Sequence, residues 1–144
     1  MKKTYHLPEE LYYDPGNQLW LRPGPQGVQV GLNALGLETL GELAYLTLNA
    51  VGTHVEKGQP MGALEAAKMT GELIAPVSGT LKAVNNAAVQ NPGIVNNDLY
   101  NAGWMVVIEP DNWEKDAAEM ISGAEVKPWA EREIRRMETQ GFDA

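Results

Sequence analysis

Lys68 is the residue of this sequence whose setting bears most directly on chemistry. A short apolar run, Met61 to Leu64, precedes it, and a second, Leu73 to Ala75, follows it. Two short strands separated by a few residues predict a hairpin, with Lys68 at or near its tip. The adjacent residues, Ala67 and Met69, offer no salt-bridge partner. Taken alone, such a lysine is most simply a solvated surface residue, so the rest of the sequence must decide whether it is functional.

The remaining composition argues against an enzyme. The chain has no cysteine, which excludes disulfides, thiolate metal sites and a cysteine nucleophile. Its two histidines, His6 and His54, both lie in turn-rich segments and form no nucleophile–base pair with a neighbour. The segment His54-Val55-Glu56 lacks a second cluster with which to bind a metal. We therefore expect no catalytic residue, no metal site and no thiol other than one supplied by a cofactor.

Length and charge narrow the class of partner. The 144 residues suit one domain with a single core, and the net charge of −8 argues against nucleic acid or an acidic membrane as partner. Nothing near about 18 consecutive apolar residues occurs, and the start, Met1 to His6, has no apolar run behind it like that of a signal peptide. These features favour a soluble, cytoplasmic protein.

The lysine segment resembles the attachment hairpin of lipoyl and biotinyl carrier domains. In those families a glutamate three residues before the modified lysine and a glycine eleven residues after it frame the site. Glu65 and Gly79 stand at these positions, and the run Pro76-Val77-Ser78-Gly79 matches the turn that follows. The resemblance implies that Glu65, Ala67, Met69 and Gly79 form the attachment motif around Lys68.

A second segment makes the resemblance specific. Residues 91–104 match the pattern Asn-Pro-x-x-Val-Asn-x-x-Pro-Tyr-x-x-Gly-Trp of the H protein of the glycine cleavage system, a signature absent from biotin carriers. Further matches follow in the same order upstream: Leu19-Trp20-Leu21-Arg22, Val30-Gly31-Leu32, Leu40-Gly41-Glu42, and Val51-Gly52 with Val55 and Gly58. The resemblance covers roughly residues 7–128. The sequence is therefore similar to that of an H-protein-like lipoyl carrier.

This resemblance implies lipoate joined to Lys68 by an amide. The arm would carry a substrate fragment between enzymes that never meet, which replaces diffusion by tethered transfer. A lipoate-attaching enzyme and dihydrolipoamide dehydrogenase are implied partners. Small residues near the lysine, Ala66, Ala67 and Gly71, leave the tip open to them, and Glu65 would position the hairpin for the attaching enzyme.

Departures from the family pattern concern the pathway. Glycine-cleavage H proteins usually have a histidine where Leu35 stands, near the arm, and His-Glu where Gln18-Leu19 stand. An amine-loaded arm requires such polar groups, so these replacements and the extended C-terminal segment resemble the lipoate-binding proteins of sulfur oxidation. These serve a heterodisulfide-reductase-like complex. The sequence slightly favours this sulfur branch over glycine cleavage, in which glycine decarboxylase and aminomethyltransferase would be the partners.

Two further alternatives remain open. The run Glu65-Ala66-Ala67-Lys68-Met69 matches the Glu-Ala-Met-Lys-Met of biotinyl domains at four of five positions. Ala67 in place of the methionine, and the presence of residues 91–104, argue against a biotin carrier. An H-like protein that is never modified would instead leave Lys68 without a role.

Short strands at fairly even spacing must position the hairpin. We expect strands at Leu11–Tyr13, Leu19–Arg22, Val28–Gly31, Leu43–Leu48, Thr80–Val84 and Trp104–Glu109, in addition to those of the hairpin. Asn33 should cap a short helix that runs through Leu40 and ends at Gly41. Residues 50–58 are predicted as turn, and residues 85–93 as loop with one helical turn. This pattern indicates a mainly β fold, a small antiparallel sandwich or flattened barrel of the lipoyl-carrier hammerhead type.

The C-terminal part is predicted to be helical. One helix should run from residues 110–112 to Ser122-Gly123, and another from Lys127-Pro128 to Gly141. In the second, Val126, Ala130, Ile134 and Met137 fall on one face and should pack on the sandwich. We therefore expect one domain over residues 1–144, with a core at about 7–110 and a helical extension at 111–144.

Overall fold

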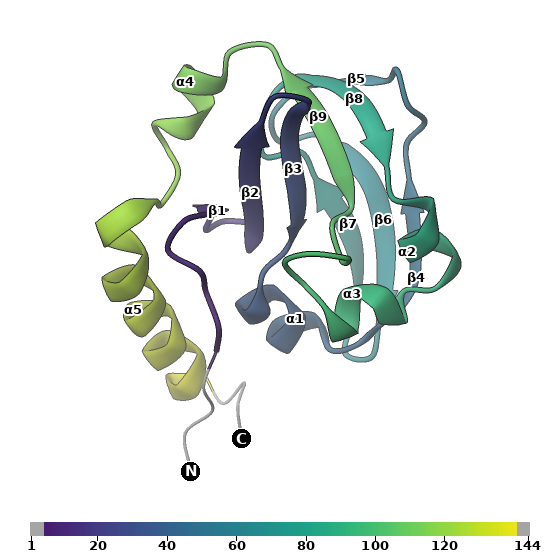
Figure 1. Ribbon diagram of the computed structural model, residues 1–144. Helices are drawn as coiled ribbons and strands as arrows, with labels where there is room; N and C mark the ends of the chain where they lie inside the picture. Colours follow the sequence, from purple (N-terminus) through teal and green to yellow (C-terminus); the bar gives the residue numbers. More distant parts are fainter. Residues whose placement is uncertain (1–4, 141–144) are drawn as a thin grey trace.

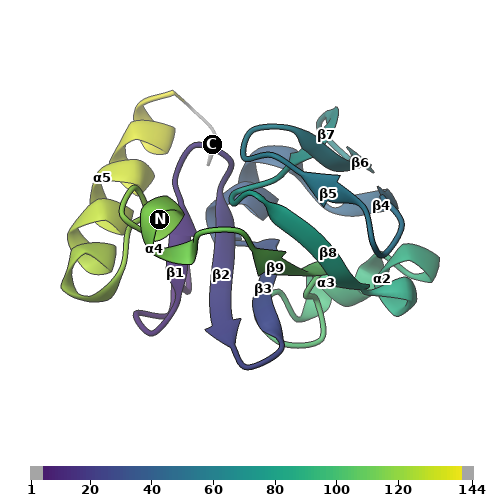
Figure 2. The same cartoon turned by 90° about the horizontal axis from the view of Figure 1, so that it is seen from above.

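Two antiparallel sheets form the body of the protein in a computed structural model that describes residues 5–140. The first sheet has six strands in the order β1 (Tyr12–Asp14), β2 (Leu19–Gly24), β3 (Gly27–Leu32), β9 (Val106–Pro110), β8 (Gly79–Val84) and β5 (His54–Val55). The second has three, in the order β4 (Leu43–Leu48), β6 (Pro60–Ala66) and β7 (Thr70–Ile74). Figure 2 shows the smaller sheet lying beside the β8–β9 part of the larger one.

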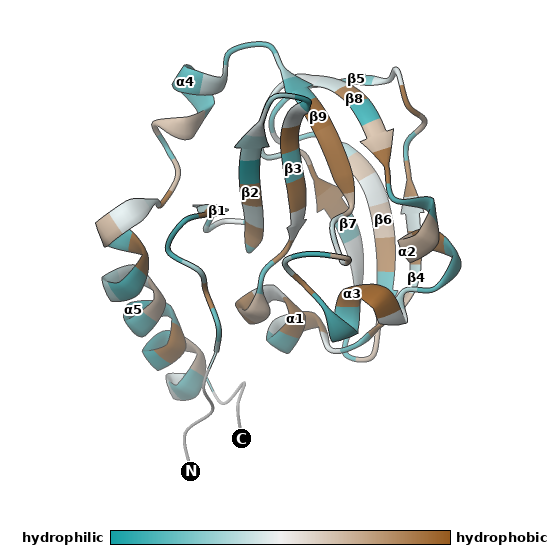
Figure 3. Ribbon diagram, viewed as in Figure 1, coloured by the Kyte–Doolittle hydropathy of each residue, from teal (hydrophilic) through white to brown (hydrophobic). Residues whose placement is uncertain are grey.

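The main core lies between these sheets. Leu21, Val30 and Ile108 of the larger sheet are buried in one cluster with Met61 and Leu73 of the smaller sheet. Along β6, Met61 and Leu64 are buried and Ala63 and Glu65 are exposed, and the spacing of three between the buried residues follows an irregularity in the pairing with β7 between Pro60 and Gly62. Figure 3 shows the apolar colouring concentrated on β3 and β9. The predicted β sandwich is confirmed, and over residues 5–140 the two sheets do not close into a barrel.

Helices lie between the strands and, in the described residues, after the last strand, β9 (Figure 1). They are α1 (Ala34–Leu40), α2 (Asn86–Gln90), α3 (Gly93–Asn97), α4 (Trp113–Ala117), the 3₁₀ turn η1 (Gly123–Glu125) and α5 (Val126–Thr139). The predicted limits of α1 are confirmed. The Asn33 side chain accepts a hydrogen bond from the Gly36 amide at 2.9 Å, and Gly41 ends the helix with a φ of 82°.

The region after β9 differs from the prediction. The expected helix from residue 110 to residue 122 is wrong, because only α4 forms there, with Asn112 as its cap. The long helix, α5, forms as expected, with Val126, Trp129 and Met137 buried. It packs against Tyr13 of β1, whose ring lies 5.4 Å from that of Trp129. Gly141, the expected end of the helix, lies outside the described residues.

Two segments predicted as turn or loop are regular. The segment at residues 50–58 contains β5, where His54 pairs with Thr80 of β8. The Nε2 atom of His54 also lies 2.7 Å from the Asp111 carboxylate, and this hydrogen bond raises the pKa of the histidine. Within residues 85–93 the expected helical turn is α2, and it is followed by a second short helix, α3, that was not predicted. Among residues 5–140, no helix has the length and apolar character needed to cross a membrane.

Gly79 owes its importance to a close approach between strands. Its φ is not positive, so the expected turn geometry does not require glycine here. Instead, Gly79 pairs with Pro110, and a Cβ on it would collide with the Glu109 carbonyl oxygen and lie 2.8 Å from the Ile108 side chain. Gly79 therefore stabilises the larger sheet.

We predict that Gly79→Ala lowers the free energy of unfolding by about 1–3 kcal/mol, because the added methyl group overpacks the β8–β9 pair. Gly71→Ala is the matched control, since a Cβ at Gly71 would meet nothing within 4 Å. Denaturant unfolding of both variants measures the difference. Equal stabilities would contradict this account of Gly79.

Candidate functional site

The tip of the β6–β7 hairpin is a two-residue turn made by Ala67 and Lys68. The Ala66 amide donates to the Met69 carbonyl oxygen at 2.9 Å and closes the turn. Neither tip residue has a positive φ, unlike the primed turns that two-residue hairpins prefer. Alanine and lysine can therefore occupy the tip without the strain that those turns impose on them.

The backbone of the tip is bound to the C-terminal end of α1. The Lys68 amide donates to the Leu40 carbonyl oxygen at 2.9 Å, and the Ala67 amide donates to the Glu42 carbonyl oxygen at 3.0 Å. The last carbonyl groups of a helix lack partners within the helix, so the tip supplies what α1 needs. Leu40 is the last residue of α1, and Glu42 lies two residues beyond it. We call this segment, with Gly41 in its middle, the ledge (Leu40–Glu42). Its two carbonyl groups bind the tip to the end of α1 and to the residues that follow the helix.

The Lys68 side chain also binds α1, as its backbone amide does. Its ammonium group donates to the Glu38 carbonyl oxygen at 2.7 Å, although the residue is exposed. The C-terminal end of a helix carries a partial negative charge that attracts a cation. The amine is therefore held at a defined place on the surface, where a second protein can reach it.

Gly41 allows the tip to approach the ledge closely. A Cβ at this position would lie 3.0 Å from the Ala67 Cβ and 3.2 Å from the Lys68 Cγ. The positive φ of Gly41 also disfavours any other residue. Sequence reasoning identified this glycine as a helix stop and as part of the family match Leu40-Gly41-Glu42, but did not predict its contact with the tip.

The structure brings four of the five residues of the attachment motif together. Glu65 and Met69 flank the tip and are exposed, Met69 at 46% of its surface, while Ala67 lies against Gly41. The fifth, Gly79, belongs to the other sheet. Gly79 therefore lies away from the tip, at the point where the chain after the hairpin enters the larger sheet.

A cleft of about 190 Å³ opens beside the tip, between α1, β7 and the start of β2. Leu40 of the ledge, which accepts from the Lys68 amide, and Gly71 of the hairpin belong to its wall, together with Thr39 of α1. The other polar side chains of the wall are Asn17, Gln18 and Glu72. Glycines and apolar residues complete it: Gly16, Leu19, Leu32, Gly36, Leu64, Leu73 and Ile74. Such a cleft can hold a flexible apolar chain and a polar end group.

Leu35 does not line this cleft. It is fully buried and packs in a second core cluster with Trp20, Val126 and Trp129. The expectation that Leu35 lies near the arm therefore finds no support in this cleft and stays a prediction. Its helix does border the cleft, but through Gly36, Thr39 and Leu40.

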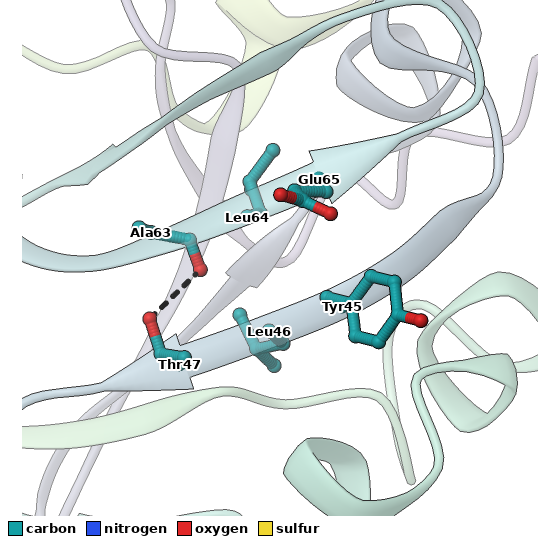
Figure 4. Close-up of a pocket in the computed structure, with 6 residues that line it drawn as sticks. All are labelled: Tyr45, Leu46, Thr47, Ala63, Leu64 and Glu65. Carbon is teal, nitrogen blue, oxygen red and sulfur yellow. Dashed lines mark hydrogen bonds between the residues drawn. The ribbon is translucent and has the colours of Figure 1, made fainter.

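An exposed groove lies on the outer face of the smaller sheet. Tyr45 of β4 and Glu65 of β6 are cross-strand partners, and 67% of the Tyr45 surface is exposed. Figure 4 shows these two side chains next to each other, beyond the Thr47 and Ala63 pair. Glu65 lies three residues before Lys68, so the groove is on the strand that leads to the tip.

The described part of the chain contains no group of three or more histidine, aspartate or glutamate residues that could hold a metal ion. Tyr100 and Tyr13 are the buried groups with strongly shifted acidity. Burial raises the pKa of Tyr100 to about 12, and it raises that of Tyr13 further. Both hydroxyl groups donate to backbone carbonyls, Tyr13 to Pro8 and Tyr100 to His6, so their roles are structural.

Comparisons with known proteins agree with one another. The family model described as Glycine cleavage H-protein matches residues 11–133. The glycine cleavage system H protein 2 of Aquifex aeolicus is 32% identical over 132 residues, covering 88% of this chain and 82% of the relative. The glycine cleavage system H protein of Synechococcus is 37% identical over 104 residues, covering 72% and 79%.

A solved structure shares the fold. The crystal structure of a glycine cleavage system H protein from Mycobacterium marinum is similar with a TM-score of 0.74 and 32% sequence identity. The match covers 86% of this chain and 98% of the other.

We predict that Gly41→Ala displaces the tip. Gly52→Ala is the control, because Gly52 also has a positive φ, of 94°, but nothing lies within 4 Å of its missing Cβ. Both variants should lose about 1–2 kcal/mol of stability through backbone strain. Only Gly41→Ala should shift the NMR amide signals of Ala67 and Lys68. If the two variants give the same tip signals, the close approach at Gly41 does not position the hairpin.

Proposed function

Because this chain belongs to the glycine cleavage H-protein family, we propose that it is a lipoate carrier whose attachment residue is Lys68. Members of the family carry lipoate covalently on a lysine, and they are carrier proteins rather than enzymes. The observation that supports Lys68 is its place at a hairpin tip that is exposed and yet held by backbone hydrogen bonds to the ledge. A ligase needs both properties in its substrate.

The residues around Lys68 fit this group. Attachment converts the ammonium into an amide: the nitrogen loses two protons and its positive charge as it bonds to the lipoyl carbonyl carbon, and the one N–H that remains can still donate to the Glu38 carbonyl oxygen. The lipoyl chain is apolar and flexible, and the cleft beside the tip has leucine walls at Leu40, Leu64 and Leu73. When bound, the group supplies a dithiol that reacts in the active sites of partner enzymes. The protein supplies attachment, orientation and a surface for docking.

We further propose that the cargo belongs to glycine cleavage. The partners would then be a lipoate-attaching enzyme, glycine decarboxylase, aminomethyltransferase and dihydrolipoamide dehydrogenase. The relatives reported above bear the name of that system, and the comparisons lend no support to the heterodisulfide-reductase-like complex that the sequence slightly favoured.

The cleft also weakens the residue-based argument for the sulfur branch. That argument rested on the replacement of the family's usual residues at Leu35 and at Gln18-Leu19, but Leu35 lies away from the cleft and Gln18 is itself polar. Glu72 lines the cleft and is exposed, so a carboxylate is available to attract a cationic aminomethyl group. Of these replaced residues, Leu19 is the apolar one that lines the cleft.

We predict that Lys68→Arg abolishes lipoylation without loss of stability, because a guanidinium group preserves the charge and the donor to Glu38 but does not form the amide. Incubation with a lipoate–protein ligase, lipoate and ATP, followed by peptide mass spectrometry, measures the modification. The wild-type chain should gain one lipoyl group on the peptide that contains Lys68. A lipoylated Lys68→Arg protein would show that the attachment residue lies elsewhere.

A second prediction concerns the pathway. The lipoylated chain, mixed with glycine decarboxylase, pyridoxal phosphate, unlabelled glycine and labelled bicarbonate, should support exchange of label into the carboxyl group of glycine. Lys68→Arg should give background exchange. An established glycine-cleavage H protein serves as the positive control. Activity of that control, together with background exchange by this lipoylated chain, would contradict a role in glycine cleavage.

A further inference from the structure

Asn96 binds the backbone of a residue that lies 53 positions earlier in the chain. Its Oδ1 atom accepts from the Leu43 amide at 2.9 Å, and its Nδ2 atom donates to the Leu43 carbonyl oxygen at 3.2 Å. Asn96 is the penultimate residue of α3, which Figure 1 places beside the lower end of β4. A single carboxamide thus satisfies both polar groups of one peptide residue, as a neighbouring strand would.

Leu43 needs such a partner because of its place in the sheet. It is the first residue of β4, which is an edge strand, and its side chain is buried. The pairing of β4 with β6 is irregular between Leu43 and Tyr45, so the ladder alone does not fix this end of the strand. The carboxamide of Asn96 therefore holds the point at which β4 begins.

Leu43 in turn continues directly from the ledge. Glu42, the residue before it, provides the carbonyl oxygen that accepts from the Ala67 amide. A displacement of Leu43 moves Glu42 and the neighbouring Gly41, against which the tip is packed. The ledge is thus held at one side by α1 and at the other by Asn96.

The segment around Asn96 also supports the other end of α1. The Tyr100 hydroxyl accepts from the Ala34 amide at 2.9 Å, in the first turn of that helix. The Leu99 carbonyl oxygen accepts from the Trp20 indole at 2.9 Å. Residues 96–100 therefore contact the helix, the strand and the core that together present the tip.

We propose that Asn96 is a positioning residue for modification of Lys68: by holding Leu43 it keeps the ledge in the place where it binds the tip. The inference rests on the proposed function and deepens it. Asn96 touches neither Lys68 nor the arm in this account, and it acts through Leu43 and Glu42. It gives a physical role to the asparagine of the segment at residues 91–104, which sequence reasoning used only to identify the family.

The test compares Asn96→Ala with Asn112→Ala in the full-length chain. Asn112 is the matched control, because its side chain also accepts a backbone amide, that of Lys115 in α4, far from the tip in sequence and in another layer. Hydrogen exchange followed by NMR measures the opening of the Ala67 and Lys68 amides. Steady-state kinetics with a lipoate–protein ligase measure the acceptance of each protein as substrate.

Asn96→Ala should raise exchange at Ala67 and Lys68 about tenfold, as expected for the loss of two hydrogen bonds that support the ledge. Exchange at Val106 and Ile108 in the core should stay unchanged. The ligase should show a raised KM for this variant with an unchanged kcat, and Asn112→Ala should match the wild type in all readings. Asn96→Asp, which retains an acceptor for the Leu43 amide, should give a smaller change in the same direction and serves if Asn96→Ala does not fold.

Wild-type exchange at the tip in both Asn96 variants, or a wild-type KM, would overturn the positioning role. Failure of the proposed function gives a different result. In that case the ligase would not modify even the wild-type chain, whereas the hydrogen-exchange experiment would still show whether Asn96 holds the tip in place.

Discussion

The structure around Lys68 depends on backbone hydrogen bonds between a hairpin tip and the end of a short helix. Two-residue turns are exposed and usually mobile, yet here the Ala67 and Lys68 amides bind the carbonyl groups of the ledge (Leu40–Glu42). The helix gains partners for groups that it cannot satisfy itself, and the tip gains a fixed orientation. The lysine is thereby accessible to another protein without being disordered, which suits a residue that several enzymes must find.

The rest of the fold supports this one contact. Asn33 caps the first turn of α1, Tyr100 binds its first amide, and Asn96 holds the strand that follows it. The larger sheet contributes a rigid core and the close β8–β9 pairing at Gly79. Acylation of Lys68 would remove a positive charge from a surface on which Glu65 and Glu72 are exposed, so the modified carrier presents a more acidic face than the unmodified one.

The sequence predicted the elements that depend on local signals. Asn33 and Gly41 mark α1 because capping needs particular residue types, and the β6–β7 hairpin follows from two apolar runs with few residues between them. The strand β5 was not predicted. Its two residues, which start at His54, are too few to show an alternating pattern of apolar and polar side chains, and they form a strand only because they pair with β8. The helix expected before Ser122 is only five residues long, since residues such as Asn112 permit a helix to start but do not dictate its length. The direction of Leu35 likewise depends on the packing of Trp20 and Trp129, which lie far from it in sequence.

At the site, the lysine and its flanking residues were predicted and the groups that hold them were not. Gly41 acts through a close approach to the tip and Asn96 through side-chain hydrogen bonds to Leu43, both between segments far apart in the chain, and no local pattern predicts such contacts. The assignment of lipoate to Lys68 is tested most directly by mass spectrometry of the protein purified from its own cells. A lipoyl group on the Lys68 peptide is the result we predict. A biotinyl group there, or a bare lysine throughout the population, would contradict the account.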